Sequence, residues 1–257
     1  MWNLIKYELK GYYKELSILL GMVVFLNLLL LTRINVWPRE AIAMFSFFIA
    51  FASSIVIFVW NISLYNRDLY GNTGYLLFTL PQKGNSILAS KFLSSFIQML
   101  AVNFVSFIFL IWNLSKVNGF DKIFLSLQES LNANALILGL LTTVYQYIYL
   151  LIFIYFCITI SKVAIRKKRT GKLGAFIMFV LLSVIIGKLG TWIMDIFSNK
   201  ISFNILTPQA FQQLSQYANL TVSPDISFNI AYCIFNFITL MGLFLATSYL
   251  LEHKMDI

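Results

Sequence analysis

The run AIAMFSFFIAFASSIVIFVWNISLYN, from Ala41 to Asn66, contains no charged residue. A helix needs about 20 mostly apolar residues to cross the hydrocarbon core of a bilayer, so this run is long enough for one span. The rest of the chain has the same character, because its 257 residues are 60% hydrophobic and only 11% charged, with a mean hydropathy of +0.81. Soluble domains carry about 25% charged residues. We therefore predict an integral membrane protein.

Five further apolar runs accompany this one, so the predicted fold class is an all-α membrane protein with six transmembrane helices. The predicted spans lie at about 16–36, 41–64, 92–114, 133–161, 174–196 and 226–251. They form one transmembrane domain over residues 16–257, preceded by a separate N-terminal segment over residues 1–15. The connecting loops are shorter than an independent soluble domain.

The basic residues predict the orientation of these spans. Most of the 19 lysines and arginines fall on one side of the membrane when the N-terminus is cytoplasmic. The segment KVAIRKKRTGK, from Lys162 to Lys172, is the strongest single anchor on that side. By the positive-inside rule, both termini are therefore predicted to be cytoplasmic.

The N-terminal segment MWNLIKYELKGYYKEL has apolar and aromatic residues at helical spacing, including Trp2, Ile5, Leu9 and Tyr12. Its lysines lie mostly on the opposite face. A basic amphipathic helix next to a span is typical of the membrane surface, so we predict an interfacial helix over residues 1–15. A helix packed on another protein is the alternative.

Several function classes are disfavoured by the composition. The basic residues behind the net charge of +9 cluster at the ends of the apolar runs, where lipid headgroups and membrane topology require them. No basic face remains for nucleic acid, which is therefore not expected as a partner. Cys157 and Cys233 lie inside spans and are predicted to be small buried hydrophobes rather than a disulfide. His253 is the only histidine, so no metal site of the His/Cys kind is predicted.

Enzymatic motifs are also missing from the sequence. The pair Gly171-Lys172 is followed by Leu173 and lacks the upstream glycine of a phosphate-binding loop, because Arg166 holds that position. There is no Gly-x-Ser-x-Gly elbow and no pair of intramembrane carboxylates. We therefore predict that the chain is not an enzyme by itself and has no catalytic, cofactor-binding or metal-binding residues.

Polar residues within the spans are the remaining site candidates, because such residues are costly in lipid and tend to face other helices or water. Four are predicted to line a cavity or an exit path: Asn27, Gln146, Lys188 and Asn236. Gly187 and Gly190 flank Lys188, so we expect the fifth span to break there and its outer part to line the path. The alternative for the amides is hydrogen bonding between helices.

The segment NRDLYGNTGYLLFTLPQKGNSILASKF, from Asn66 to Phe92, separates the second and third predicted spans. Its apolar residues recur at helical spacing, and Pro81 ends the pattern. A short helix with an exposed apolar face fits a groove on a partner protein. A helix lying on lipid is the alternative.

This segment resembles the cytoplasmic loop between the second and third spans of ABC-2 type permeases. The resemblance rests on Arg67-Asp68, Gly74, Leu76-Leu77, Leu80-Pro81 and Lys91, and the C-terminal SYLLEHKMDI is similar to tails of that family. It implies a coupling helix that contacts a separate ATPase. The residues implied in this contact are Asp68, Leu69, Thr73, Leu76, Leu77, Leu80 and Pro81.

The resemblance further implies two permease chains and two ATPase subunits in a bacterial cell membrane, with ATP and Mg bound by the ATPase. The second permease is either identical to this chain or a homologous one. The expected function is export of an amphipathic or hydrophobic substrate, of which an antimicrobial or toxic peptide is the favoured example. A membrane immunity, sensor or assembly protein without transport is the alternative.

Overall fold

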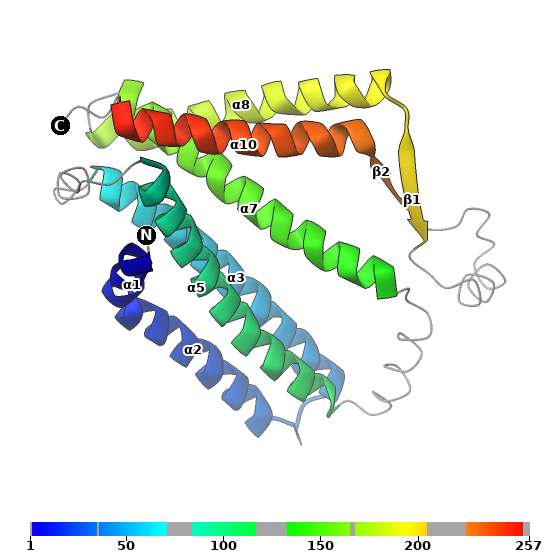
Figure 1. Ribbon diagram of the computed structural model, residues 1–257. Helices are drawn as coiled ribbons and strands as arrows, with labels where there is room; N and C mark the ends of the chain where they lie inside the picture. The colour runs from blue at the N-terminus through cyan, green and yellow to red at the C-terminus, as the bar shows by residue number, and fades with distance from the viewer. Residues whose placement is uncertain are drawn as a thin grey trace. The chain divides into compact units, whose positions relative to one another are not determined.

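The structure is a computed structural model that describes residues 2–34, 36–70, 84–116, 133–164, 168–204 and 225–253. These residues are almost entirely helical (Figure 1). The helices are α1 (Trp2–Gly11), α2 (Tyr13–Thr32), α3 (Arg39–Tyr70), α5 (Gly84–Leu114), α7 (Ala133–Ala164), α8 (Lys168–Ile196) and α10 (Ile230–His253). Apart from α1, each is long and apolar enough to cross a membrane. The predicted all-α class with six spans is confirmed.

The helix ends differ from the predicted span ends. Helix α3 continues to Tyr70, beyond the predicted end at 64, and α5 begins at Gly84, before the predicted start at 92. Polar and charged residues at the ends of a span continue the same helix beyond the hydrocarbon core. A prediction based on hydropathy finds only the apolar part of such a helix. In the other direction, α10 begins at Ile230 rather than 226, because residues 225–229 form a strand.

Contacts divide the chain into two compact units, Met1–Phe120 with Thr247–Ile257, and Asp121–Ala246. In the first unit, α3 packs along α5, α2 packs against both, and the short helix α1 packs on α5. A small apolar core joins Leu19 of α2, Ile57 of α3 and Val102 of α5. The three long helices of this unit are therefore held by direct side-chain packing.

A buried polar network also joins the three helices. Ser46 of α3 donates a hydrogen bond to Oδ1 of Asn27 on α2 at 2.8 Å. The amide of Asn113 on α5 donates to Oγ of Ser46 at 3.0 Å and to Asn27 at 3.3 Å. All three side chains are almost completely buried. Asn27 thus makes the interhelical hydrogen bonds that polar groups in a span require.

The second unit contains α7, α8, the first part of α10 and a two-stranded antiparallel hairpin. Its strands are β1 (Lys200–Asn204), which follows α8, and β2 (Asp225–Asn229), which leads into α10. In the register, Ser202 pairs with Ser227, and Ile201 pairs with Phe228. The rings of Phe203 and Phe228 meet edge to face with centroids 6.0 Å apart.

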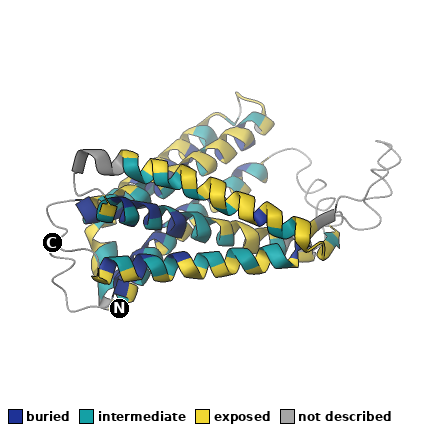
Figure 2. Cartoon of the chain, turned by 90° about the horizontal axis from the view of Figure 1, so that it is seen from above, coloured by how far each residue is buried: buried dark blue, intermediate teal, exposed yellow. Residues whose placement is uncertain are grey.

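Exposed residues occur along the long helices (Figure 2), and many of them are large and apolar. Phe45 and Phe48 on α3, and Phe176 and Leu181 on α8, are about half exposed or more. Exposed apolar surface on this scale is unfavourable in water and favourable in lipid. The six apolar helices therefore define a multi-pass membrane protein in a lipid bilayer.

Replacing Asn27 with leucine tests the polar network. Asn27→Leu keeps the side-chain size but removes the acceptor shared by Ser46 and Asn113. We expect a loss of about 1 kcal/mol of stability, the typical scale for an interhelical hydrogen bond in a membrane. Thermal unfolding of the full chain in detergent measures it. Thr32→Val on the same helix is the control, since Thr32 is exposed and bonds only to its own helix.

Candidate functional sites: an ion cluster and an apolar cavity

The first site is a cluster of one buried lysine and two partly buried carboxylates in the first unit. Lys91 of α5 lies between Glu8 of α1 and Asp68 of α3, with Nζ 3.4 Å from Oε1 of Glu8 and also paired with Oδ2 of Asp68. The three side chains are 7%, 15% and 19% exposed. Oγ of Ser94 donates to the other oxygen of Glu8 at 2.7 Å. Lys91 is therefore the shared cation for two carboxylates from two other helices.

Local sequence explains how these groups meet. Ile5 of α1 is buried, and Glu8 lies one turn further along the same helix face, so the packed face of α1 carries the acid inward. Asp68 is near the end of α3 and Lys91 is near the start of α5. The cluster thus ties α1 to the two helices that flank residues 71–83.

Tyr12, at the break between α1 and α2, extends the cluster. Its hydroxyl donates to Oδ1 of Asp68 at 3.4 Å, and the guanidinium of Arg67 lies 5.2 Å from the centre of its ring. Burial raises the pKa of the Tyr12 phenol, so the hydroxyl keeps its proton and remains a donor at physiological pH. The carboxylate of Asp68 therefore receives donors from α5 and from the break between α1 and α2.

Gly84 fixes the first turn of α5 against the end of α10. Its N–H donates to Oε2 of Glu252 at 3.3 Å. A Cβ atom at this position would lie only 2.5 Å from the carbonyl oxygen of Ser248, which is backbone and cannot move aside. Glycine is therefore required for this close approach.

The structure places two of the predicted coupling residues in this region. Asp68 pairs with Lys91, and Leu69 is 3% exposed, so both side chains contact this chain's own helices. The other five lie outside the described residues: Thr73, Leu76, Leu77, Leu80 and Pro81. The interfacial placement of α1 remains a prediction; its side chains Ile5 and Glu8 pack into the unit, whereas Trp2 is exposed.

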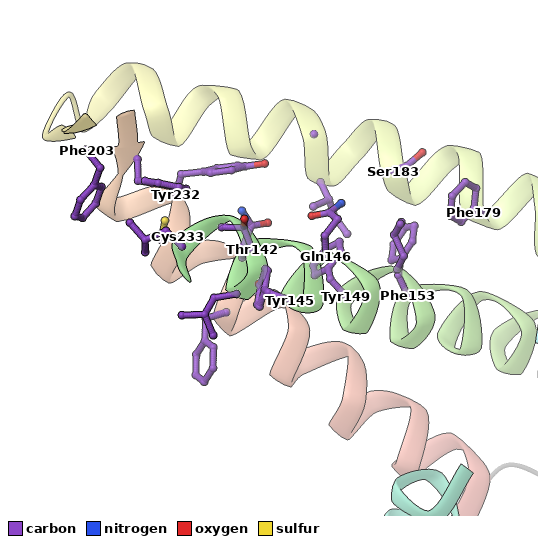
Figure 3. Close-up of a pocket in the computed structure, with 18 residues that line it drawn as sticks. Thr142, Tyr145, Gln146, Tyr149, Phe153, Phe179, Ser183, Phe203, Tyr232 and Cys233 are labelled. Carbon is purple, nitrogen blue, oxygen red and sulfur yellow. The ribbon is translucent and has the colours of Figure 1, made fainter. Parts of the chain in front are cut away.

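The second site is a cavity of about 740 Å³ in the second unit, formed by α7, α8, α10 and the hairpin (Figure 3). Tyr145, Tyr149 and Phe153 project from α7 at intervals of one turn, with neighbouring ring centroids 6.3 and 6.1 Å apart. Phe179 of α8 continues this row, 5.2 Å from Phe153. We call these four residues the aromatic wall.

Two of the predicted cavity residues line this space. Gln146 projects from α7 and Asn236 from α10, and neither makes a hydrogen bond with another described residue. Among the described lining residues there is no charged side chain. The arrangement is an apolar chamber with two uncharged amides, which is able to bind a neutral ligand but not to pair an ion.

The other two candidates lie elsewhere. Asn27 belongs to the polar network of the first unit. Lys188 is exposed and does not line the cavity, although its neighbour Gly187 does. The predicted break of the fifth span is wrong, because α8 is continuous from Lys168 to Ile196. Gly190 instead allows close packing, since a Cβ there would lie 2.7 Å from the ring of Tyr232 on α10.

Sequence reasoning missed the aromatic wall, the hairpin and the ion cluster. The wall has a readable signal in aromatic residues spaced by four along α7, and the hairpin has one in the repeated ISFN, at Ile201–Asn204 and Ile226–Asn229. The ion cluster has no readable sequence signal, because its members are far apart in the chain.

Comparisons of the chain with protein-family models, curated proteins and solved structures found no match. Within the part of the chain that the structure describes, no group of histidine, cysteine, aspartate and glutamate side chains has the arrangement of a metal site. The sites are therefore interpreted from their own residues.

Removing the shared cation tests the ion cluster. Lys91→Met leaves the partly buried carboxylates of Glu8 and Asp68 without their shared cation, and we expect a loss of about 3 kcal/mol of stability, the lower end of the cost of leaving a buried charge unpaired. Thermal unfolding of the full chain measures this loss. Lys10→Met, at an exposed lysine of α1, is the matched control and should leave the melting temperature unchanged.

The triple variant Glu8→Gln, Asp68→Asn, Lys91→Met removes every charge of the triad and should recover most of the lost stability. Equal melting temperatures for Lys91→Met and Lys10→Met would contradict a stabilising role for the cluster.

Proposed function

We propose that this chain is the membrane subunit of an ATP-binding-cassette exporter, in which a separate subunit binds ATP and Mg and hydrolyses the nucleotide. The observation that carries the proposal is the pattern of Asn66–Phe92, which resembles the coupling loop of ABC-2 type permeases. The surroundings of this loop support it. A loop that receives force must be attached firmly to the helices that it moves.

The attachments lie on both sides of residues 71–83. On the α3 side, Asp68 pairs with Lys91 and accepts a hydrogen bond from Tyr12. On the α5 side, Lys91 pairs with Glu8 and Gly84 bonds to Glu252. Displacing the loop should therefore displace α1, α3 and α5 together, because separating the charges would leave Lys91 buried and unpaired.

The lining of the cavity supports the proposed class of exported molecule. Its aromatic wall and its lack of charged lining residues suit a hydrophobic or amphipathic molecule better than a small ion. Export of such a molecule, for example an antimicrobial or toxic peptide, across a bacterial cell membrane is the proposed activity. The proposed assembly contains two ATPase subunits and a second permease chain, identical or homologous.

The proposal predicts that the full chain co-purifies with a P-loop ATPase and is required for vanadate-sensitive ATPase activity. Leu77→Asp and Leu80→Asp should each uncouple hydrolysis from export, because a carboxylate cannot be buried in an apolar groove without a partner. We expect transport into inside-out vesicles to fall by about tenfold or more.

Leu127→Asp is the matched control, since it places the same change in the loop after the third span, on the opposite predicted side of the membrane. Normal transport by the Leu77 and Leu80 variants would refute the coupling role. Purification of the chain without any ATPase, under conditions that keep α-helical membrane complexes intact, would favour a non-transporting membrane protein.

A further inference from the structure

The amides of Gln146 and Asn236 pose a physical problem. Both face the cavity, and neither has a hydrogen-bond partner among the described residues. Polar groups within a span are costly unless they are paired. In the first unit the amides of Asn27 and Asn113 are paired with each other and with Ser46. The cavity amides are therefore available to a ligand.

Depth in the membrane restricts which ligand suits them. Gln146 lies nine residues after Ile137, the first residue of the stretch of α7 that is long and apolar enough to cross a membrane, so it is roughly 13 Å along that stretch. Asn236 lies six residues after the start of α10, roughly 9 Å along it. The ester carbonyls of membrane lipids lie at the boundary between headgroups and hydrocarbon. A bound lipid would thus place its bare hydrocarbon chain beside these amides.

A peptide backbone matches the amides better. Each peptide unit carries one donor and one acceptor, as a carboxamide does, and inside a bilayer it must find partners for both. The lining of the cavity along α7 extends from Leu138 to Phe153, roughly 22 Å at 1.5 Å per residue. An extended peptide at about 3.3 Å per residue would occupy it with about six residues.

We propose that this cavity binds an extended, uncharged apolar peptide segment, whose backbone amides pair with Gln146 and Asn236 and whose side chains lie on the aromatic wall. This inference rests on the proposed function in taking the exported molecule as the source of the peptide. The inference also predicts selection against charged peptides, because no described lining residue carries a charge that could pair with one. A peptide with a lysine in the segment should therefore be rejected.

The test uses the full chain in phospholipid nanodiscs without ATPase or nucleotide. The probe is a capped hexapeptide of leucine and phenylalanine that carries one photoleucine. Gly187 lines the cavity and faces open space, so Gly187→Trp fills the site without a clash at Cβ. Gly139 of α7 also faces open space but does not line the cavity, so Gly139→Trp is the matched control.

We expect ultraviolet crosslinking to map to the aromatic wall, to fall by about tenfold in Gly187→Trp and to persist in Gly139→Trp. The double variant Gln146→Leu, Asn236→Leu should weaken binding of the peptide by about tenfold. It should weaken binding of an N-methylated analogue by less, because that analogue keeps its backbone acceptors but lacks the donors. A peptide with one lysine should bind the wild-type chain about a hundredfold more weakly.

Equal crosslinking in the two tryptophan variants would overturn the proposal. So would competition by a palmitoyl ester as strong as that of unlabelled peptide, since the occupant would then be a lipid chain. Because the assay contains no ATPase, a negative result leaves the test of the exporter assignment intact. Failure of the chain to purify with an ATPase likewise leaves the binding result interpretable.

Discussion

Lys91 carries a charge inside the first unit, where it is surrounded by helices rather than by water. Such a charge is tolerated only with a partner, and Lys91 takes one carboxylate from α1 and another from α3. This single requirement fixes the rotation of α5, the docking of the amphipathic helix α1 and the end of α3. The ends of the segment between α3 and α5 are consequently set by electrostatics as well as by apolar packing.

Amide side chains have different surroundings in the two units. In the first unit, Oδ1 of Asn27 accepts hydrogen bonds from Ser46 and from the amide nitrogen of Asn113, and these bonds join three helices, although Oδ1 of Asn113 has no partner among the described residues. In the second unit, Gln146 and Asn236 face an open chamber and are satisfied by no described residue. The same residue type therefore serves stability in one place and offers binding capacity in the other, and only the surroundings distinguish them.

The sequence predicts features that depend on local composition and misses features that depend on contacts between distant residues. Long apolar runs determine the six spans, because a helix is the only structure that such a run forms across a bilayer unless it closes into a barrel. The hairpin was missed because its strands are short and the second merges with an apolar run. Pairing of Lys91 depends on residues 23 and 83 positions away, which no local pattern reports. The break expected at Lys188 does not occur, because Gly190 supports contact with Tyr232 rather than a loss of helix.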